Sequence, residues 1–510
     1  MVNKNPLKVL FVAAEVAPFA SVGGLSQVMY FLPRALKKLG VDARIFLPKF
    51  GSINEAKFGI KMLHRDLQVP SGEKEGTHEL ICNVKIWEGG VREPIVYFLE
   101  NMEYFEMRAN VYGYSDDPIR FALLSRGALE FLKVSDWQPN VINCNDWHTG
   151  FLANYLRTYY KNDPKLKKMA TVFSIHNLTH QGTFDHRFVP ELDVDDGRSQ
   201  ISSFFDERLG KQNFMKRGIL YADLVNTVSE TYAKEMLTPE YGEGLDSLIK
   251  EVRTKVFGVL NGLDYNDFNP ATDKIIKTNY SLKNISSRLE NKLDLQKEFG
   301  LPVSAEIPIL AISGRLTEQK GLDLMINILP FLLKEYPIQF IAMGGGDNKY
   351  RGFFVDLEKE FPRQVGTHLL PHWTLPRKIF SGADIFLAPS KWEPCGITVI
   401  EAMRYGCVPI VRTTGGLADT VTDYNATTDT GTGFSFQNFN ELSFFATIVR
   451  ALETYKNKSA WQGIVKRAMK EDLSWQASAK KYLDLYQRAI VFRQESLSPN
   501  PPKGFKGEEE

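Results

Sequence analysis

The segment ADIFLAPSKWEPCGITVIEAMRYGCVPIV, residues 383–411, constrains the fold of this chain more than any other. It predicts a short buried strand at 385–388, a polar loop, a helix that ends near Gly406, and a second buried strand at 408–411. Apolar strands that alternate with helices are typical of α/β proteins with a parallel sheet. The segment therefore predicts an α/β fold.

The loop of this segment also carries chemistry. Glu393 precedes a Pro-Cys-Gly turn, and Glu401 is expected about one turn into the following helix. The amides of Gly396, Ile397 and Thr398 open that helix, and a helix N-terminus offers unpaired N–H groups and the positive end of a dipole. The segment predicts an anion site with a carboxylate beside it, an arrangement that suits a sugar nucleotide.

The same organisation recurs along the chain. Residues 7–50 predict a strand, the glycine-rich turn APFASVGG, a helix ended by Gly40 and another strand, and further strand–helix pairs follow up to VFGVLNGLD. After a polar stretch at about 265–305 the pattern begins again with EIPILAISGRL. Because 510 residues exceed a single core, two βαβ halves in series with a cleft between them are expected. SVGGLSQV at 21–28 and TTGGLADT at 413–420 echo each other, which shared turn chemistry alone can explain.

Composition narrows the class of partner. Sixty-two basic and 61 acidic residues give a formal net charge of +1, which favours neither nucleic acid nor an anionic membrane as a partner. The four cysteines are scattered without metal-site spacing, and no segment has the roughly 20 apolar residues of a membrane helix. These features indicate a cytoplasmic protein with reduced thiols.

Two further groups follow predicted strands. Arg315 and Lys320 flank a loop where they could clamp a diphosphate. Their spacing alone favours a solvated basic pair. Together with the helix start at Gly396, the diphosphate site is favoured. His176 and Asn177 end another strand and predict a substrate contact. Asp146 is expected to cap the helix near residue 149 or to bind sugar hydroxyls.

The two glutamates of the first segment allow other interpretations. Glu393 could cap the helix and Glu401 could form a surface pair, or two carboxylates could belong to a glycosidase. A hydrolase of neutral sugars has no need of an anion site, so departure of a nucleoside diphosphate from a sugar is favoured. MGGGD at 343–347 lacks the G-x-G-x-x-G spacing and predicts a tight turn with close backbone approach, not an NAD site.

The chain resembles the bacterial and plant-type glycogen and starch synthases. The resemblance rests on EVAPFASVGGLSQV, NDWHTG, FSIHNLTHQGTF, GRLTEQKGLDL, EPCGITVIEAMRYG and RTTGGLADTV, among other stretches from residue 7 to about 490. It implies the GT-B architecture, in which two Rossmann-like domains face an interdomain cleft, and a retaining glucosyltransferase that needs neither cofactor nor metal.

The resemblance also implies site residues. On the donor side they are Arg315, Lys320, Glu393, Cys395, Gly396, Ile397, Thr398 and Glu401. Arg315 and Lys320 would hold the diphosphate, Glu393 would contact the glucose, and Glu401 would hold the ribose. His176, which would contact the glucose where the acceptor arrives, is expected to be catalytic together with Glu393, Arg315 and Lys320. The other substrate-binding residues are Ser21, Gly23, Gly24, Asp146 and Asn177.

The chain departs from the family pattern at two positions that matter for the donor. Ser21 stands where the family has a lysine, and Pro371 stands where an aromatic residue often stacks on the base. The sequence therefore leaves open whether ADP-glucose or UDP-glucose is the donor.

The resulting prediction is a glycogen (starch) synthase that moves glucose from ADP-glucose or UDP-glucose to the non-reducing end of an α-1,4-glucan with retention. The alternatives are a related transferase with a small sugar or sugar-phosphate acceptor and a glucan-binding protein with a degraded site. The expected domains are 1–262 on the acceptor side and 263–475 on the donor side. A helix at 476–495 is expected to cross back to the first domain, and a disordered tail at 496–510 to follow it.

Overall fold

The computed structural model describes residues 6–72, 78–184 and 195–498, and the chain forms two compact units. Unit 1 comprises Met1–Val228, Ala233–Val259 and Trp475–Glu510, and unit 2 comprises Ser229–Tyr232 and Leu260–Ser474. Most of the tail predicted at 496–510 lies outside the described residues. Each unit is described by itself below.

Unit 1 is built on a nine-stranded sheet with the order β3-β4-β5-β2-β1-β6-β7-β8-β9. The strands are β1 (Lys8–Val12), β2 (Asp42–Pro48), β3 (Lys61–Pro70), β4 (Glu79–Trp87), β5 (Ile95–Glu100), β6 (Val141–Asn145), β7 (Ala170–Ile175), β8 (Leu224–Thr227) and β9 (Val256–Gly258). The seven strands from β5 to β9 in this order are parallel, whereas β4 is antiparallel to both β3 and β5. Strands β6, β7 and β8 are buried along their whole length, as expected for parallel strands covered on both faces.

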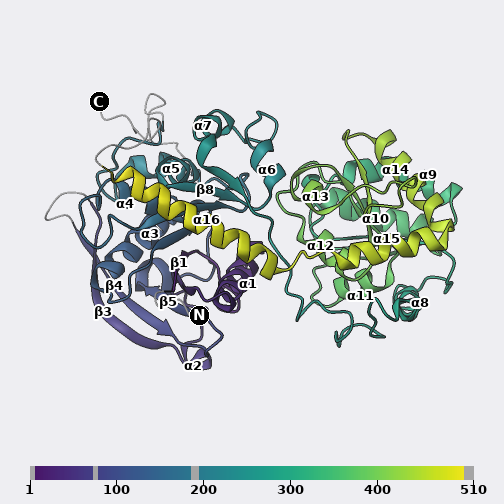
Figure 1. Cartoon of the computed structure of the whole chain (residues 1–510), viewed down its shortest axis with the longest axis horizontal. Helices are drawn as coiled ribbons and strands as arrows, with labels where there is room; N and C mark the ends of the chain where they lie inside the picture. Colours follow the sequence, from purple (N-terminus) through teal and green to yellow (C-terminus); the bar gives the residue numbers. More distant parts are fainter. Residues whose placement is uncertain (1–5, 73–77, 185–194, 499–510) are drawn as a thin grey trace. The chain divides into compact units, whose positions relative to one another are not determined.

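The helices of unit 1 pack in two groups against this sheet. Helix α1 packs with α16, which also contacts β6 and β7. Figure 1 shows α16 crossing the unit and beginning beside α1. Helices α3, α4 and α5 pack in succession, and α3 and α4 also contact the sheet. The bounds are α1 (Gly24–Lys38), α2 (Glu55–Phe58), the π-helix η1 (Met102–Glu106), α3 (Asp117–Val134), η2 (Trp147–Thr149), α4 (Gly150–Arg157), η3 (Glu207–Lys211), α5 (Phe214–Tyr221), α6 (Glu230–Glu235, which begins in unit 2), α7 (Asp246–Glu251), η4 (Arg253–Lys255) and α16 (Trp475–Ser496).

Unit 2 is built on a six-stranded parallel sheet with the order β12-β11-β10-β13-β14-β15. The strands are β10 (Ile309–Ser313), β11 (Gln339–Met343), β12 (Val365–His368), β13 (Ile385–Ala388), β14 (Val408–Arg412) and β15 (Phe434–Phe436). The helices are η5 (Ile285–Ser287), α8 (Arg288–Glu298), η6 (Glu318–Lys320), α9 (Leu322–Glu335), α10 (Asn348–Glu360), α11 (Leu375–Gly382), α12 (Ile397–Arg404), α13 (Gly415–Thr420), α14 (Glu441–Lys456) and α15 (Lys458–Lys470). One hydrophobic core runs through the unit and includes Ile309, Phe340, Ile385 and Val408.

The segment at 383–411 folds as its sequence predicts. Strand β13 covers 385–388, α12 ends at Arg404 just before Gly406, and β14 begins at Val408. Gly406 has a φ of +71°, a left-handed conformation in which glycine commonly ends a helix. The predicted close approach at MGGGD is also confirmed, because a Cβ on Gly344 would lie 1.7 Å from the oxygen of Gly314.

Candidate functional site

In unit 2, a pocket opens at the carboxyl edge of the sheet. Strands β10 and β13 pair in parallel, so the loops that follow them adjoin, and this edge is where open α/β sheets bind ligands. The pocket encloses about 400 Å³, including space open to solvent. Its polar lining includes Gly314, Arg315, Lys320, Ser390, Glu393 and Thr398.

Lys320 and Glu393 form an ion pair inside this pocket. The Lys320 ammonium contacts Oε2 of Glu393, which also accepts a hydrogen bond from Ser390 Oγ at 3.2 Å. The side chain of Glu393 is 10% exposed and that of Lys320 is 25% exposed. The alternative in which Glu393 caps α12 is wrong: Gly396 occupies the cap position, and the carboxylate turns to Lys320.

The start of α12 depends on two glycines. Gly396 adopts a left-handed conformation with a φ of +83°, and a Cβ there would lie 2.5 Å from Cδ2 of Leu417. A Cβ on Gly416 would lie 2.0 Å from the oxygen of Cys395, and the Gly416 amide donates to the main-chain oxygen of Glu393 at 3.0 Å. The Gly-Gly-Leu turn at 415–417 thus packs directly under the Glu-Pro-Cys-Gly loop and fixes the direction in which the first amides of α12 point.

The remaining polar groups of unit 2 differ in exposure. Arg315 is exposed, and its guanidinium donates to Oε1 of Gln319 at 3.4 Å. Cys395 is a buried free thiol, and burial raises its pKa to about 12, so it is protonated at neutral pH. The main-chain amides of residues 395–398, rather than this sulfur, are the groups suited to binding.

Glu401 lies in α12 and is partly buried. Burial raises the pKa of its carboxyl to about 7, while the positive charge of Arg377 opposes that rise. Because Glu401 is not exposed, the alternative of a surface helix pair is wrong for it. A carboxyl group with this pKa can donate or accept a hydrogen bond near neutral pH.

In unit 1, His176 follows β7 and is held on two sides. Its amide donates to Oδ1 of Asp146 at 2.8 Å, and its Nε2 lies 3.0 Å from Oδ1 of Asn145. Nδ1 is buried and has no hydrogen-bond partner within the described residues. Burial lowers the pKa of the imidazole to about 4, so the ring is neutral at neutral pH.

Asp146 holds this edge together and does not cap a helix. It has a φ of +54°, and no side-chain bond links it to the N-terminus of η2. Its carboxylate instead accepts from the amides of His176 and Asn177. Burial raises its pKa to about 7, and the negative charge of Glu15 adds to the effect. The predicted cap is wrong because the parallel register of β6 and β7 brings these amides closer.

The loop Ser21–Gly24 is exposed, and buried residues hold it from behind. Ser21 Oγ lies 2.7 Å from Ser26 Oγ. Glu15 is only 3% exposed and accepts from the amides of Val22 and Gly23, both at 2.7 Å. Asn177, partly buried, bonds the Thr179 amide through its side chain at 3.1 Å.

Sequence reasoning missed four polar residues of these two edges: Glu15, Tyr112, Asn145 and Ser390. Glu15 and Asn145 stand at or just past the ends of apolar strands, a position that could have marked them. Tyr112 donates its hydroxyl to Glu15 at 3.0 Å from a loop 97 residues away, and no local pattern indicates that contact.

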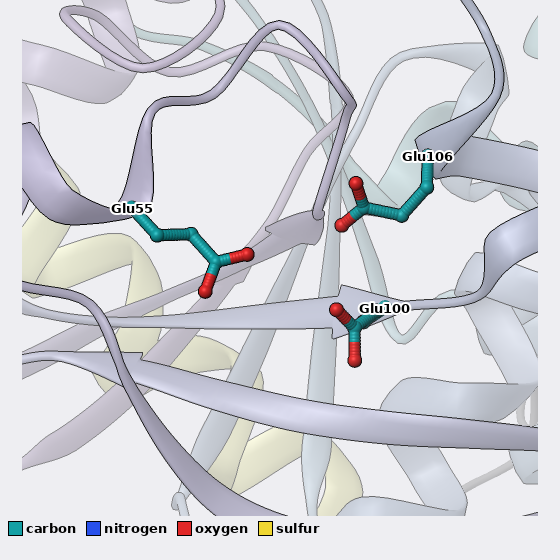
Figure 2. Close-up of side chains that lie close together, drawn as sticks. All are labelled: Glu55, Glu100 and Glu106. Carbon is teal, nitrogen blue, oxygen red and sulfur yellow. The ribbon is translucent and has the colours of Figure 1, made fainter.

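One group of carboxylates among the described residues lies close enough together to hold a metal ion. It consists of Glu55, Glu100 and Glu106, whose side chains Figure 2 shows converging from α2, the end of β5 and η1. Lys49 Nζ lies 2.8 Å from Glu106 and 3.2 Å from Glu55, and Lys85 pairs with Glu55 and Glu100. Each of the three carboxylates is paired with one or both of these two lysines, which offset two of the three negative charges, and we assign no metal to the group.

The described helices include none that is long and apolar enough to cross a membrane. Two sequence families match the chain: the starch synthase catalytic domain over residues 8–251 and the glycosyl transferases group 1 over residues 296–466. Glycogen synthase of Clostridium perfringens is 42% identical over 487 residues, covering 95% of this chain and 98% of that protein. Glycogen synthase of Clostridium beijerinckii is 43% identical over 94% of this chain and 99% of that protein.

Solved structures agree with these relatives. The catalytic domain of starch synthase IV from Arabidopsis thaliana, bound to ADP and acarbose, superposes with a TM-score of 0.81 and 32% identity, covering 96% of this chain and 100% of that one. Sucrose-phosphate synthase from Thermosynechococcus elongatus superposes with a TM-score of 0.57 and 16% identity, covering 95% and 99% of the two chains. The second similarity concerns the fold alone.

Proposed function

Because the chain belongs to the glycogen and starch synthase family, we propose that it transfers glucose from ADP-glucose to the non-reducing end of an α-1,4-glucan with retention of configuration. The observation that carries this proposal is the pocket in which Arg315, Lys320 and Glu393 meet the start of α12. The ADP of the starch synthase IV structure supports the choice of nucleotide.

The donor diphosphate is assigned to the cationic side of the pocket. Arg315 offers a planar fork and Lys320 a compact charge, and both stabilise the negative charge that develops on the departing nucleoside diphosphate. The amides of Ile397 and Thr398 have no intrahelical acceptor at the start of α12 and are assigned to the distal phosphate. These groups act most strongly in the transition state, where the leaving charge is largest.

Glu393 is assigned to the transferred glucose. Its carboxylate is fixed by Lys320 and Ser390, so it needs little reorganisation when positive charge develops at the anomeric carbon. The amides of Cys395 and Gly396 are assigned to glucose hydroxyls. Glu401, with a pKa of about 7, is assigned to the ribose, whose hydroxyls can pair with either protonation state.

On unit 1 we assign the acceptor side. His176 presents a neutral ring with an unpaired Nδ1 and is assigned to the glucose. Asp146 and Asn177 flank it, and the exposed loop that contains Ser21, Gly23 and Gly24 is assigned to substrate as well. We therefore assign the acceptor to residues 1–262 and the donor to residues 263–475.

The compartment and partners follow from the same proposal. The donor is a nucleoside diphosphate glucose and the acceptor is glycogen or a shorter glucan. Four free buried cysteines are compatible with the reducing conditions of a cytoplasm, where we place the protein.

One assay tests the function directly. Release of nucleoside diphosphate is measured with ADP-glucose and with UDP-glucose, each with and without glycogen. Glycogen-dependent release that is faster from ADP-glucose is the expected result. Release driven only by a small sugar or sugar phosphate would replace the proposal with the small-acceptor transferase, and glycogen binding without turnover of either donor would replace it with a binding protein.

The loop position Ser21 is tested in the same assay. Ser21→Lys adds the cation that the family pattern has there, and a lower KM or higher kcat for ADP-glucose is expected if the loop lies near the donor or acceptor. Unchanged kinetic constants would mean that the position has no part in the reaction.

A further inference from the structure

The loop that carries Glu393 has no helix or strand of its own. It comprises residues 389–396, between the end of β13 at Ala388 and the start of α12 at Ile397. Because it lacks the main-chain bonds of a helix or strand, its shape depends on bonds from neighbouring segments. Two segments of unit 2 supply them: the loop after β10, which carries Lys320, and residues 412–416 at the end of β14.

A buried arginine, Arg412, binds the middle of this loop. It is the last residue of β14 and is 9% exposed. Its Nη1 donates to the main-chain oxygen of Lys391 at 2.6 Å, and its Nε donates to that of Gln437 at 3.2 Å. Within the described residues no other hydrogen bond reaches the Lys391 oxygen. The charge-assisted bond from Arg412 therefore fixes this carbonyl.

The main-chain amide of Lys391 is bound by the loop that carries Lys320. It donates to the main-chain oxygen of Gln319 at 2.9 Å, and Gln319 directly precedes Lys320 in η6. Residue 391 thus connects Arg412 with the segment that carries the ammonium of the Lys320–Glu393 pair. Glu393, which carries the carboxylate of that pair, stands only two residues further along the loop.

An aromatic ring orients the guanidinium of Arg412. The guanidinium lies 5.6 Å from the centre of the Phe439 ring, within the range of about 6 Å for a cation–π contact. The same ring packs against Gly321, which follows Lys320 directly. A Cβ on Gly321 would lie 3.1 Å from Cε2 of Phe439 and 1.9 Å from the main-chain oxygen of Pro389. Arg412, its ring and the two loops are therefore in close mutual contact.

We propose that Arg412 is a positioning residue for the transfer: it fixes the main chain of the Glu393 loop against the loop of Lys320 and thereby sets where the carboxylate meets the ammonium. This inference rests on the proposed function for the identity of the reaction. The bond to Lys391 acts on Glu393 through two residues of main chain. Since a displacement of about 1 Å can lower a rate about 100-fold, this bond contributes to catalysis as well as to stability.

The test compares Arg412→Ala, Arg412→Lys and a matched control. Arg412→Ala removes the donor to the Lys391 carbonyl, whereas Arg412→Lys keeps the charge but replaces the planar fork with a point charge. The control is Arg493→Ala in α16 of unit 1. Arg493 is also 9% exposed, and its Nε and Nη2 donate to a main-chain oxygen, that of Lys167, at 3.0 and 2.7 Å. It has no part in the proposed reaction.

The kinetic constants separate positioning from general stability. In glycogen-dependent release of ADP, Arg412→Ala is expected to have a kcat about 100-fold lower than the wild type. Its KM for ADP-glucose should stay within about threefold, because the groups assigned to the diphosphate are all present. Arg412→Lys should lose about tenfold in kcat, since it keeps one charged donor. Arg493→Ala should unfold at a lower urea concentration and keep its kcat.

An unfolding measurement tests the inference without any transfer of glucose. Lys320→Gln breaks the pair with Glu393, and its effect on the unfolding equilibrium constant in urea is measured in the wild-type and Arg412→Ala backgrounds. If Arg412 sets the geometry of the pair, this effect should be at least about fivefold smaller in the Arg412→Ala background. In the Arg493→Ala background it should equal the effect in the wild type.

Three results would overturn the inference: a kcat of Arg412→Ala within about threefold of the wild type, a kcat of Arg493→Ala that falls as far, or an equal effect of Lys320→Gln in both backgrounds. The second would mean that kcat only follows stability. Should Arg412→Ala not fold, Arg412→Lys replaces it in both measurements, and a kcat equal to that of the wild type would then overturn the inference. Absence of transfer by the wild type would refute the proposed function and would leave the unfolding measurement to decide this one.

Discussion

Replacing Lys320 with glutamine separates what this residue does for stability from what it does for the reaction. In Lys320→Gln the Glu393 carboxylate, 10% exposed as a side chain, loses its cation and keeps only neutral donors, among them the Ser390 hydroxyl at 3.2 Å. Breaking a buried ion pair from one side costs about 3–5 kcal/mol. The Lys320 side chain is 25% exposed, so water replaces part of the loss and about 1–3 kcal/mol of unfolding free energy is expected to disappear.

The double variant Lys320→Gln/Glu393→Gln should recover part of that stability, because two neutral amides can hydrogen-bond each other and no charge is left unpaired. A coupling energy of about 1–3 kcal/mol is expected for residues in direct contact. The activity should not recover: losing a group that stabilises the leaving charge costs about 100- to 1000-fold in kcat, and the second substitution removes the carboxylate assigned to the glucose.

The measurements are urea unfolding and glycogen-dependent release of ADP for both single variants and the double variant. Lys391→Gln is the matched control, because Lys391 forms an exposed pair with Glu318 at 2.7 Å near the same sheet edge and should contribute only about 0–1 kcal/mol. Recovery of activity together with stability in the double variant would show that Lys320 acts only by holding Glu393, and would refute its assignment to the diphosphate.

Three further predictions follow from the same geometry. Gly396→Ala places a Cβ on a left-handed residue and 2.5 Å from Cδ2 of Leu417. The free energy of unfolding in urea is expected to fall by about 2–5 kcal/mol. An unchanged ADP affinity in the folded variant would refute the role of the α12 start. Glu401 has a pKa of about 7 in the folded protein, against an ordinary value of 4.5, so its contribution to the free energy of unfolding declines as the pH rises from 4.5 to 7. Glu401→Gln should flatten this decline when the free energy of unfolding is measured from pH 4.5 to 8. A pH profile identical to that of the wild type would contradict the prediction. His176 has a pKa of about 4 in the folded protein instead of 6.5, so the free energy of unfolding falls as the pH falls from 6.5 toward 4. His176→Gln should reduce this loss in the same titration. A loss as steep as in the wild type would refute the burial of a neutral ring.

Parallel strands were the part of the fold that the sequence predicted well. β1, β6, β7, β10, β13 and β14 are short apolar runs bounded by polar turns, and burial on both faces leaves them no other assignment. The β3–β4 hairpin was not predicted. Its strand β3 lies at the edge of the sheet, exposes half of its residues and contains register shifts near His64. Its sequence lacks a regular alternation of apolar and polar residues.

The candidate site, too, could be predicted only in part from the sequence. Arg315, Lys320 and Glu393 could be selected because each follows a predicted strand, and the pairing of β10 with β13 brings them together. The ion pair between Lys320 and Glu393 could not be predicted, since it joins residues 73 positions apart through side-chain geometry. Asp146 was predicted to be a helix cap because a local partner is the first that a sequence indicates, whereas its carboxylate accepts from amides just after the neighbouring strand β7.

The two Gly-Gly-Leu turns have the same local sequence, but their glycine amides bond oxygens of different charge. In the first turn the Gly23 amide donates to the side-chain carboxylate of Glu15, so a full negative charge lies against the start of a helix. In the second turn the Gly416 amide donates to the main-chain oxygen of Glu393, and the carboxylate of that residue is directed to Lys320 instead. A neutral carbonyl leaves the positive end of the nearby helix uncompensated, whereas a carboxylate cancels it. On our proposal the diphosphate binds at the start of α12, against which the second turn packs.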